Sequence, residues 1–110
     1  MVKRLRADGW TAQRSAGSRG LWDVAAVKRG HRPRLIQCKY TAGAQPLDSR
    51  PPAVVLDANA RALLALEGAD ETPVDAELWV YFRGCAAPYT YVVWQGSWRQ
   101  DTTLLFIWQR

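Results

Sequence analysis

The chain has 110 residues, so we expect a single domain over residues 1–110 with one modest core. Its 48% hydrophobic content and six tryptophans exclude an intrinsically disordered protein. The formal net charge is +5, and twelve of the fifteen cationic side chains are arginine, whose planar guanidinium suits phosphate groups. Charge therefore favours a polyanionic partner, although a merely soluble basic surface explains it as well.

The cysteines and the N-terminal segment bear on the cellular setting. Cys38 and Cys85 are too few for a disulfide scaffold and lack the paired spacing of a zinc site. The first residues, MVKRLRADGW, contain cations but no apolar stretch typical of a signal peptide, and no apolar run reaches the length of a membrane span. We therefore expect a soluble, cytoplasmic protein with reduced thiols.

The first forty residues predict a short helix followed by three strands. Residues 1–8 have the character of the last turns of a helix that Gly9 ends, so the helix looks truncated at its start. Residues 10–14 read as a strand, and the SAGSRG segment after them reads as a turn or loop. Two short apolar runs, residues 21–27 and 34–40, are joined by KRGHRP as a hairpin.

Three polar residues of this hairpin can share one patch. Side chains alternate along a strand, so Gln37 and Lys39 face one side, whereas Cys38 faces the other. Asp23 lies on the neighbouring strand, where it can sit opposite that pair. The hairpin therefore predicts a polar cluster of one carboxylate, one amide and one ammonium group.

The rest of the chain predicts one helix and two or three more strands. Apolar residues recur at helical spacing between residues 55 and 66, with Asp57 as a candidate N-cap, Arg61 facing solvent and an end near Gly68. The prolines at 51 and 52 can equally mark an earlier start. Residues 76–82, 89–95 and 102–108 are rich in aromatic and β-branched residues and read as strands. Most of the aromatic side chains should form a core or a subunit interface, and Trp98 is the candidate for exposure.

The polar cluster suits phosphodiester hydrolysis with a divalent cation. A cation such as Mg²⁺ needs only one or two protein carboxylates, because it keeps several waters. Asp23 would anchor the metal, and the Gln37 side-chain oxygen and the Cys38 backbone carbonyl are possible further ligands. Lys39 could hold the attacking water and stabilise charge on the phosphate. Each residue alone is weak support, since a lone strand aspartate is more often a turn residue than a ligand.

The ordered set of residues resembles a known family. The segments GWTAQRSAGSRGLWDV and LIQCKY are similar to the core of archaeal and phage Holliday junction resolvases, which belong to the PD-(D/E)xK nuclease superfamily. The resemblance implies a restriction-endonuclease-like α/β core, with a central mixed sheet flanked by helices. It also implies Mg²⁺ or Mn²⁺ as cofactor and a homodimer that makes paired cuts in branched double-stranded DNA.

The resemblance assigns roles residue by residue. Asp23 is implied as metal ligand, Gln37 stands where the family commonly has glutamate, and Lys39 is implied as the catalytic lysine, with Arg14 and Ser18 beside the scissile phosphate. We expect DNA contacts from two segments. The first strand and the turn after it contribute Arg14, Ser15, Ser18 and Arg19, and the hairpin connection contributes Arg29 and Arg32. We expect His31 to be exposed. The arginines around it are either a solvent-exposed charge cluster or contacts to the phosphates of one DNA arm.

One expected ligand is missing. The family's first helix carries a glutamate well before the turn that matches Gly9, but no glutamate precedes Glu67 in this chain. We expect that glutamate to lie upstream of Met1. The alternatives are a related nuclease that acts on flaps, ends or ordinary duplex, and a catalytically impaired nucleic-acid-binding module, since one carboxylate binds a hard cation poorly.

Overall fold

The computed structural model describes residues 2–14, 22–43, 49–67, 74–94 and 96–101, and every structural statement below concerns those residues. Two α-helices, one short 3-10 helix and six strands follow one another along the chain. They are α1 (Val2–Ala7), β1 (Thr11–Arg14), β2 (Val24–Val27), β3 (Arg34–Thr41), η1 (Ala53–Val55), α2 (Ala58–Glu67), β4 (Asp75–Phe82), β5 (Tyr89–Trp94) and β6 (Ser97–Gln100).

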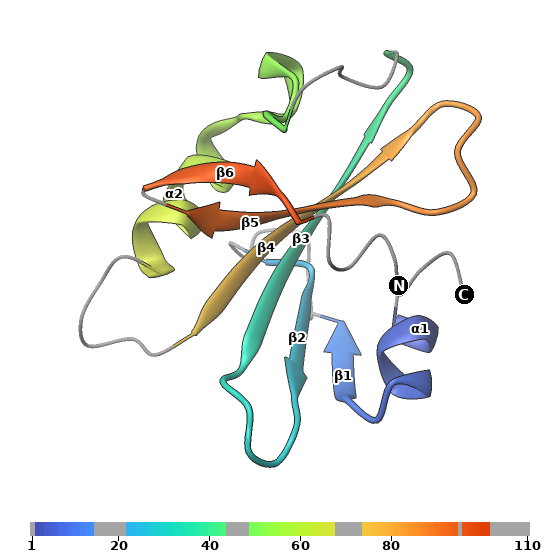
Figure 1. Cartoon of the computed structure of the whole chain (residues 1–110), viewed down its shortest axis with the longest axis vertical. Helices are drawn as coiled ribbons and strands as arrows, with labels where there is room; N and C mark the ends of the chain where they lie inside the picture. The colour runs from blue at the N-terminus through green and yellow to red at the C-terminus, as the bar shows by residue number, and fades with distance from the viewer. Residues whose placement is uncertain (1, 15–21, 44–48, 68–73, 95, 102–110) are drawn as a thin grey trace.

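The six strands form one mixed sheet whose spatial order, β1 to β6, is the order of the sequence (Figure 1). Every neighbouring pair is antiparallel except β3 and β4, which run parallel. A parallel pair needs a crossover connection, and η1 and α2 lie in the segment that connects β3 to β4. The predicted α/β class with a central mixed sheet is confirmed.

The two helices pack on opposite faces of the sheet. Leu78 on β4 belongs to a core cluster that includes Leu63 of α2, whereas its neighbour Trp79 belongs to a second cluster with Leu5 of α1. Consecutive strand residues point to opposite faces, so α2 covers one face and α1 the other. The sheet therefore has an α2 face and an α1 face, and the alternation along β3 decides which residues share a face with α2.

Local sequence signals explain where the helices and the hairpin end. Gly9, just after α1, adopts a φ of 87°, a left-handed conformation that glycine reaches without the Cβ clash. Asp57 caps α2, because its Oδ1 accepts a hydrogen bond from the backbone N–H of Ala60 at 2.9 Å. The β2–β3 hairpin contains Gly30 at a φ of 83°. The short first helix that ends before Gly9, the three N-terminal strands and the N-cap at Asp57 were all predicted correctly.

The C-terminal third differs from its prediction. Residues 97–100 form β6, although no strand was predicted in their polar sequence, SWRQ. Trp98 is only 5% exposed, and its Nε1 donates a hydrogen bond to the Ala60 carbonyl of α2 at 3.3 Å. The expectation of an exposed Trp98 is therefore wrong, since β6 pairs with β5 and turns this ring into the α2-side core. The strand predicted over residues 102–108 lies outside the described residues. Neither described helix has the length and apolar content that crossing a bilayer requires.

Candidate functional site

The predicted polar cluster lies at one end of the β2–β3 pair. Asp23 directly precedes β2, and its backbone N–H donates to a β3 carbonyl oxygen at 2.8 Å. On β3, Gln37 and Lys39 alternate in phase with Leu35, which packs in the α2-side core. Gln37 and Lys39 therefore share the α2 face, as predicted, and Asp23 lies at the same end of the neighbouring strand.

The Asp23 carboxylate is tied to β3 by a hydrogen bond. Its Oδ2 accepts from the backbone N–H of Cys38 at 2.7 Å, while the side chain stays exposed. This contact holds the carboxylate across the gap between the two strands. Burial raises the pKa of the Cys38 thiol, so that side chain is a neutral, partly buried group. Coordination by the Cys38 carbonyl stays a prediction.

Gln37 contributes a buried oxygen without a hydrogen bond. The residue is 3% exposed, and within the described ranges its Oε1 has no hydrogen-bond partner. A buried polar atom left unpaired costs about 1–3 kcal/mol, so such an atom calls for a partner outside the protein's own described groups. An oxygen is the donor type that Mg²⁺ takes, and this amide oxygen fits a ligand role.

Lys39 is paired with a residue that the sequence reasoning did not assign to the site. Its Nζ forms a short ion pair with Oδ2 of Asp57, the N-cap of α2. The pKa of the Asp57 carboxyl is lowered, first by this hydrogen bond from Lys39. Asp57 thus uses one oxygen to cap α2 and the other to hold the Lys39 ammonium group.

The topology explains why Asp57 reaches Lys39. The two residues are 18 positions apart in sequence, but β3 leads into the crossover that contains α2. In open α/β sheets the crossover helix starts near the carboxyl end of the preceding strand, where ligands commonly bind. An N-cap aspartate in the segment that follows the strand of Gln37 and Lys39 was the available signal, and the interpretation of Asp57 as a cap alone overlooked it.

The carboxylates of the described residues do not form a preassembled metal cage. Within the parts of the chain that the structure describes, no group of three or more His, Cys, Asp or Glu side chains is placed to hold a metal ion. A metal at this position would therefore depend on the Asp23 carboxylate together with neutral oxygens such as Gln37 Oε1.

The arginine and serine residues of the predicted phosphate grip are only partly described. Arg14 ends β1, opposite Val24 in the register, and its side chain is exposed. Strand alternation places Arg14 on the α1 face with the buried Ala12, which is the face opposite to Lys39. Ser15, Ser18 and Arg19 lie outside the described residues. The contact of these four residues with a phosphate stays a prediction.

The arginines of the β2–β3 hairpin lie far from this cluster. The hairpin precedes Arg34, the first residue of β3, and Lys39 is near the other end of that strand. Arg32 forms an ion pair with Asp75 at 3.5 Å and donates to the Val74 carbonyl at 3.0 Å. Arg29 is exposed at the tip. The hairpin does not project toward the Lys39 end of β3, so any DNA contact there is separate from the candidate site.

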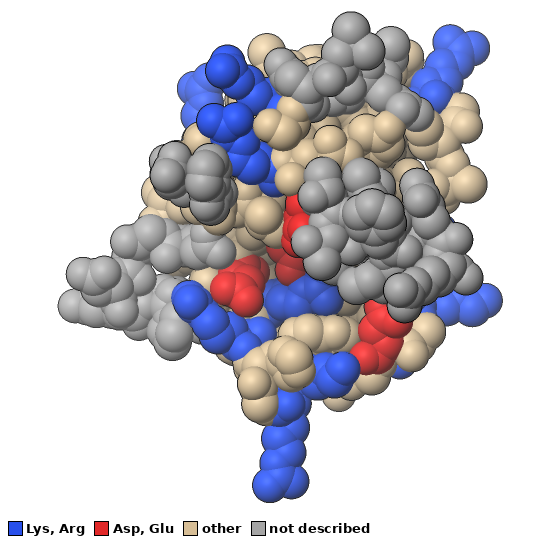
Figure 2. All heavy atoms as spheres, viewed as in Figure 1, with Lys and Arg blue, Asp and Glu red and all other residues tan. Residues whose placement is uncertain are grey.

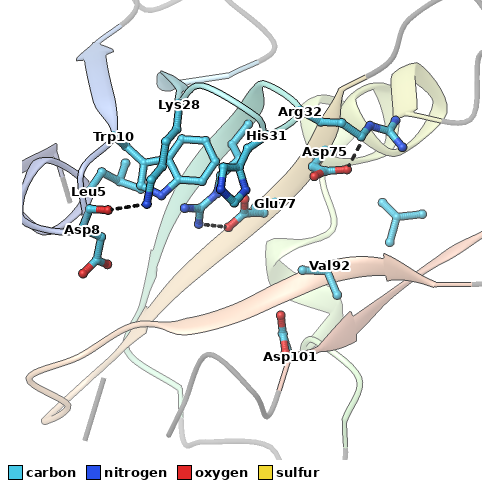
Figure 3. Close-up of a pocket in the computed structure, with 13 residues that line it drawn as sticks. Leu5, Asp8, Trp10, Lys28, His31, Arg32, Asp75, Glu77, Val92 and Asp101 are labelled. Atoms are coloured by element: carbon cyan, nitrogen blue, oxygen red, sulfur yellow. Dashed lines mark hydrogen bonds and ion pairs between the residues drawn. The ribbon is translucent and has the colours of Figure 1, made fainter. Parts of the chain in front are cut away.

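Glu77 does not replace the missing carboxylate, because it belongs to the opposite face. It lies in phase with Trp79 on the α1 face and lines a pocket of about 520 Å³ (Figure 3). There its carboxylate accepts from Arg34 Nη2 at 2.6 Å and from Trp79 Nε1 at 3.0 Å. The Arg34 guanidinium also stacks 4.8 Å from the centre of the Trp10 ring. Acidic and basic side chains alternate around the central hollow in Figure 2, which is consistent with such internal pairing.

Comparison with known proteins adds information on the fold. A crystal structure of Archaeoglobus fulgidus Hjc, described as a Holliday junction resolvase from an archaeal hyperthermophile, superposes with a TM-score of 0.53. This chain shares its fold. The superposition covers 96% of this chain and 88% of the archaeal protein at 13% sequence identity, so the likeness concerns the fold alone. No family model and no curated protein matches the sequence.

Proposed function

We propose that this protein is a metal-dependent DNA endonuclease that resolves four-way junctions by paired phosphodiester hydrolysis. The observation that carries the proposal is the arrangement of Asp23, Gln37 and Lys39 at one end of β2 and β3, in a fold shared with a Holliday junction resolvase. A nuclease-like role is consistent with the net charge of +5 and its arginine bias.

The residues of the cluster divide the chemical tasks. Mg²⁺, or Mn²⁺ in its place, would neutralise phosphate charge and supply a nucleophile near neutral pH. Asp23 and the Gln37 side-chain oxygen would hold the cation, with the Cys38 carbonyl as a further ligand. The hydrogen bond from the Cys38 N–H fixes the direction of the Asp23 carboxylate, so little reorientation is needed on binding.

Lys39 would stabilise the negative charge that develops on the phosphate. Its ammonium group is mobile on a four-carbon stem, and the ion pair with Asp57 orients that group toward the start of α2. A phosphate oxygen can take over the contact as the substrate binds. Asp57 acts here as a positioning residue, because it touches Lys39 rather than the reacting atoms.

Paired cuts in a junction need two active sites, so the proposal includes a homodimer. The absence of a three-residue acidic group among the described residues favours a second candidate function. In this alternative the chain is a nucleic-acid-binding module with little catalytic capacity, since hard-cation affinity follows the number of charged ligands.

Cleavage and metal binding together test the proposal. Purified protein is incubated with Mg²⁺ and labelled four-way junction, flap and linear duplex, and Mn²⁺ binding is measured by calorimetry. Asp23→Asn keeps the oxygen that accepts from Cys38 but removes the charge, so it should lose both metal binding and cleavage. Lys39→Ala should keep metal binding and lose cleavage.

Matched controls separate these effects from a general loss of charge. Asp8→Asn and Lys3→Ala make the same changes at exposed positions of the α1 region and should leave both readouts unchanged. Symmetric junction cuts support the proposal. Equal cleavage of junction and duplex would remove the junction specificity, and tight DNA binding without any cutting would establish the binding module instead.

A further inference from the structure

A second pocket on the α2 face has an apolar floor. It has a volume of about 360 Å³ and is lined by residues of the segment before η1, of the η1–α2 segment and of β6. Its floor consists of Pro51, Leu56, Leu64 and the buried Trp98, whose indole is anchored to α2 by the hydrogen bond to the Ala60 carbonyl. This size and apolar lining are typical of a small-molecule site.

The rim of this pocket is cationic. Arg50, Arg61 and Arg99 come from three different segments, and none of the eight described residues that line the pocket is acidic. Arg99 donates to Ser49 Oγ at 3.4 Å, and the Gln100 N–H donates to the Ser49 carbonyl at 2.8 Å, so the segment that carries Arg50 is fastened to β6. Figure 2 shows Lys and Arg side chains gathered over the region of η1 and β6.

The pocket adjoins the candidate site. Leu56 in its floor directly precedes Asp57, the partner of Lys39. Arg61 on its rim is one turn further along α2, and its backbone N–H donates to the Asp57 carbonyl at 3.1 Å. A strand with one phosphate near Lys39 can therefore place a neighbouring nucleotide over the pocket.

We propose that this arginine-rimmed pocket binds one unpaired nucleotide of a DNA strand, with the base on the apolar floor and the flanking phosphates on the arginine rim. Apolar contact with a base is tolerant of sequence, and guanidinium groups pair with phosphate, so the chemistry of floor and rim matches the two parts of a nucleotide. The inference rests on the proposed function for its location, and it adds a preference for substrates with unpaired nucleotides next to the cut.

Binding without metal tests the inference separately from catalysis. Fluorescence anisotropy of a short labelled oligothymidylate is measured in EDTA over a range of salt, with thymidine monophosphate as competitor. Arg61→Ala removes an exposed rim cation, and Arg83→Ala removes an exposed arginine that does not line the pocket. Arg61→Ala should weaken oligothymidylate binding by about tenfold and lower the salt slope by about 0.7, whereas Arg83→Ala should change neither.

The base contact is tested by a second variant. Leu64→Gln changes the floor without changing charge, and circular dichroism checks that the variant is folded. It should weaken oligothymidylate binding but leave the salt slope unchanged. Equal losses for Arg61→Ala and Arg83→Ala would overturn the inference in favour of general charge attraction. If Arg61→Ala weakened the binding of an acidic peptide as much as it weakens oligothymidylate binding, the inference would be overturned in favour of a protein partner. Junction cleavage by wild-type protein with no oligothymidylate binding would leave the proposed function standing and reject the pocket.

Discussion

Asp57 offers a substitution whose two effects on stability can be separated. Its Oδ1 caps α2 by accepting from the Ala60 N–H, and its Oδ2 pairs with Lys39. Asp57→Asn keeps an oxygen for the cap but removes the charge of the ion pair, whereas Asp57→Ala removes both. The two variants therefore measure the pair and the cap in turn.

The structure sets the size of each effect. Loss of an aspartate N-cap costs about 1 kcal/mol. The ion pair is worth at most about 1 kcal/mol, because the side chain of Asp57 is 47% exposed and that of Lys39 is 19% exposed. We expect Asp57→Asn to lower the free energy of unfolding by less than about 1 kcal/mol, and Asp57→Ala to lower it by about 1–2 kcal/mol. For a chain of this length, each kcal/mol lowers Tm by about 4 °C.

The pH dependence of stability tests the contribution of the Asp57–Lys39 ion pair in a second way. Because the pKa of Asp57 is lowered below its ordinary value of 3.8, the ion pair contributes full stability above that pH and loses it as pH falls through the folded-state pKa. Urea denaturation of wild type and Asp57→Asn should differ at neutral pH and converge in acid. An Asn variant as unstable as the Ala variant, or a difference that persists far below pH 3.8, would refute this reasoning.

Three further predictions concern Glu77, Cys38 and Gly9. Glu77→Gln should lower the free energy of unfolding by about 3 kcal/mol in urea denaturation, because it leaves the guanidinium of Arg34, whose side chain is 12% exposed, without its counter-charge, while the double variant Arg34→Met, Glu77→Leu should recover most of the loss. Cys38 should react with iodoacetamide more slowly in the native protein than in urea, because burial raises the pKa of its thiol; equal rates would contradict that burial. Gly9→Ala should cost about 1 kcal/mol in thermal denaturation, because a φ of 87° is strained for alanine, and an unchanged Tm would contradict this.

The N-terminal half of the fold was predictable because its signals are local. The alternation along residues 34–40 predicted that Gln37 and Lys39 face the same side of the sheet. The structure places both on the same side as Leu35. The α2 cap at Asp57 was likewise a local signal. Periodicity and capping depend on neighbours within a few residues, so both can be recognised from the sequence without knowledge of tertiary contacts.

Other parts of the site depend on contacts that no local pattern contains. The pairing of Lys39 with Asp57 requires the crossover between two parallel strands, and the burial of the Gln37 oxygen requires the packing above β3. β6 was missed because SWRQ is short and polar, and its strand geometry comes from pairing with β5. Tertiary context decides such segments more than propensity does.

The consecutive strand order also sets the order in which the protein can assemble during synthesis. Asp23, Gln37 and Lys39 all lie in the segment from β1 to β3, a meander whose strand pairings join residues close in sequence. Joining β4 to β3 closes the longest connection between sheet neighbours, residues 42–74, and therefore carries the largest loop-closure entropy of the sheet. We expect the emerging chain to bring these three side chains together early, and the ion pair between Asp57 and Lys39 to form once the crossover is complete.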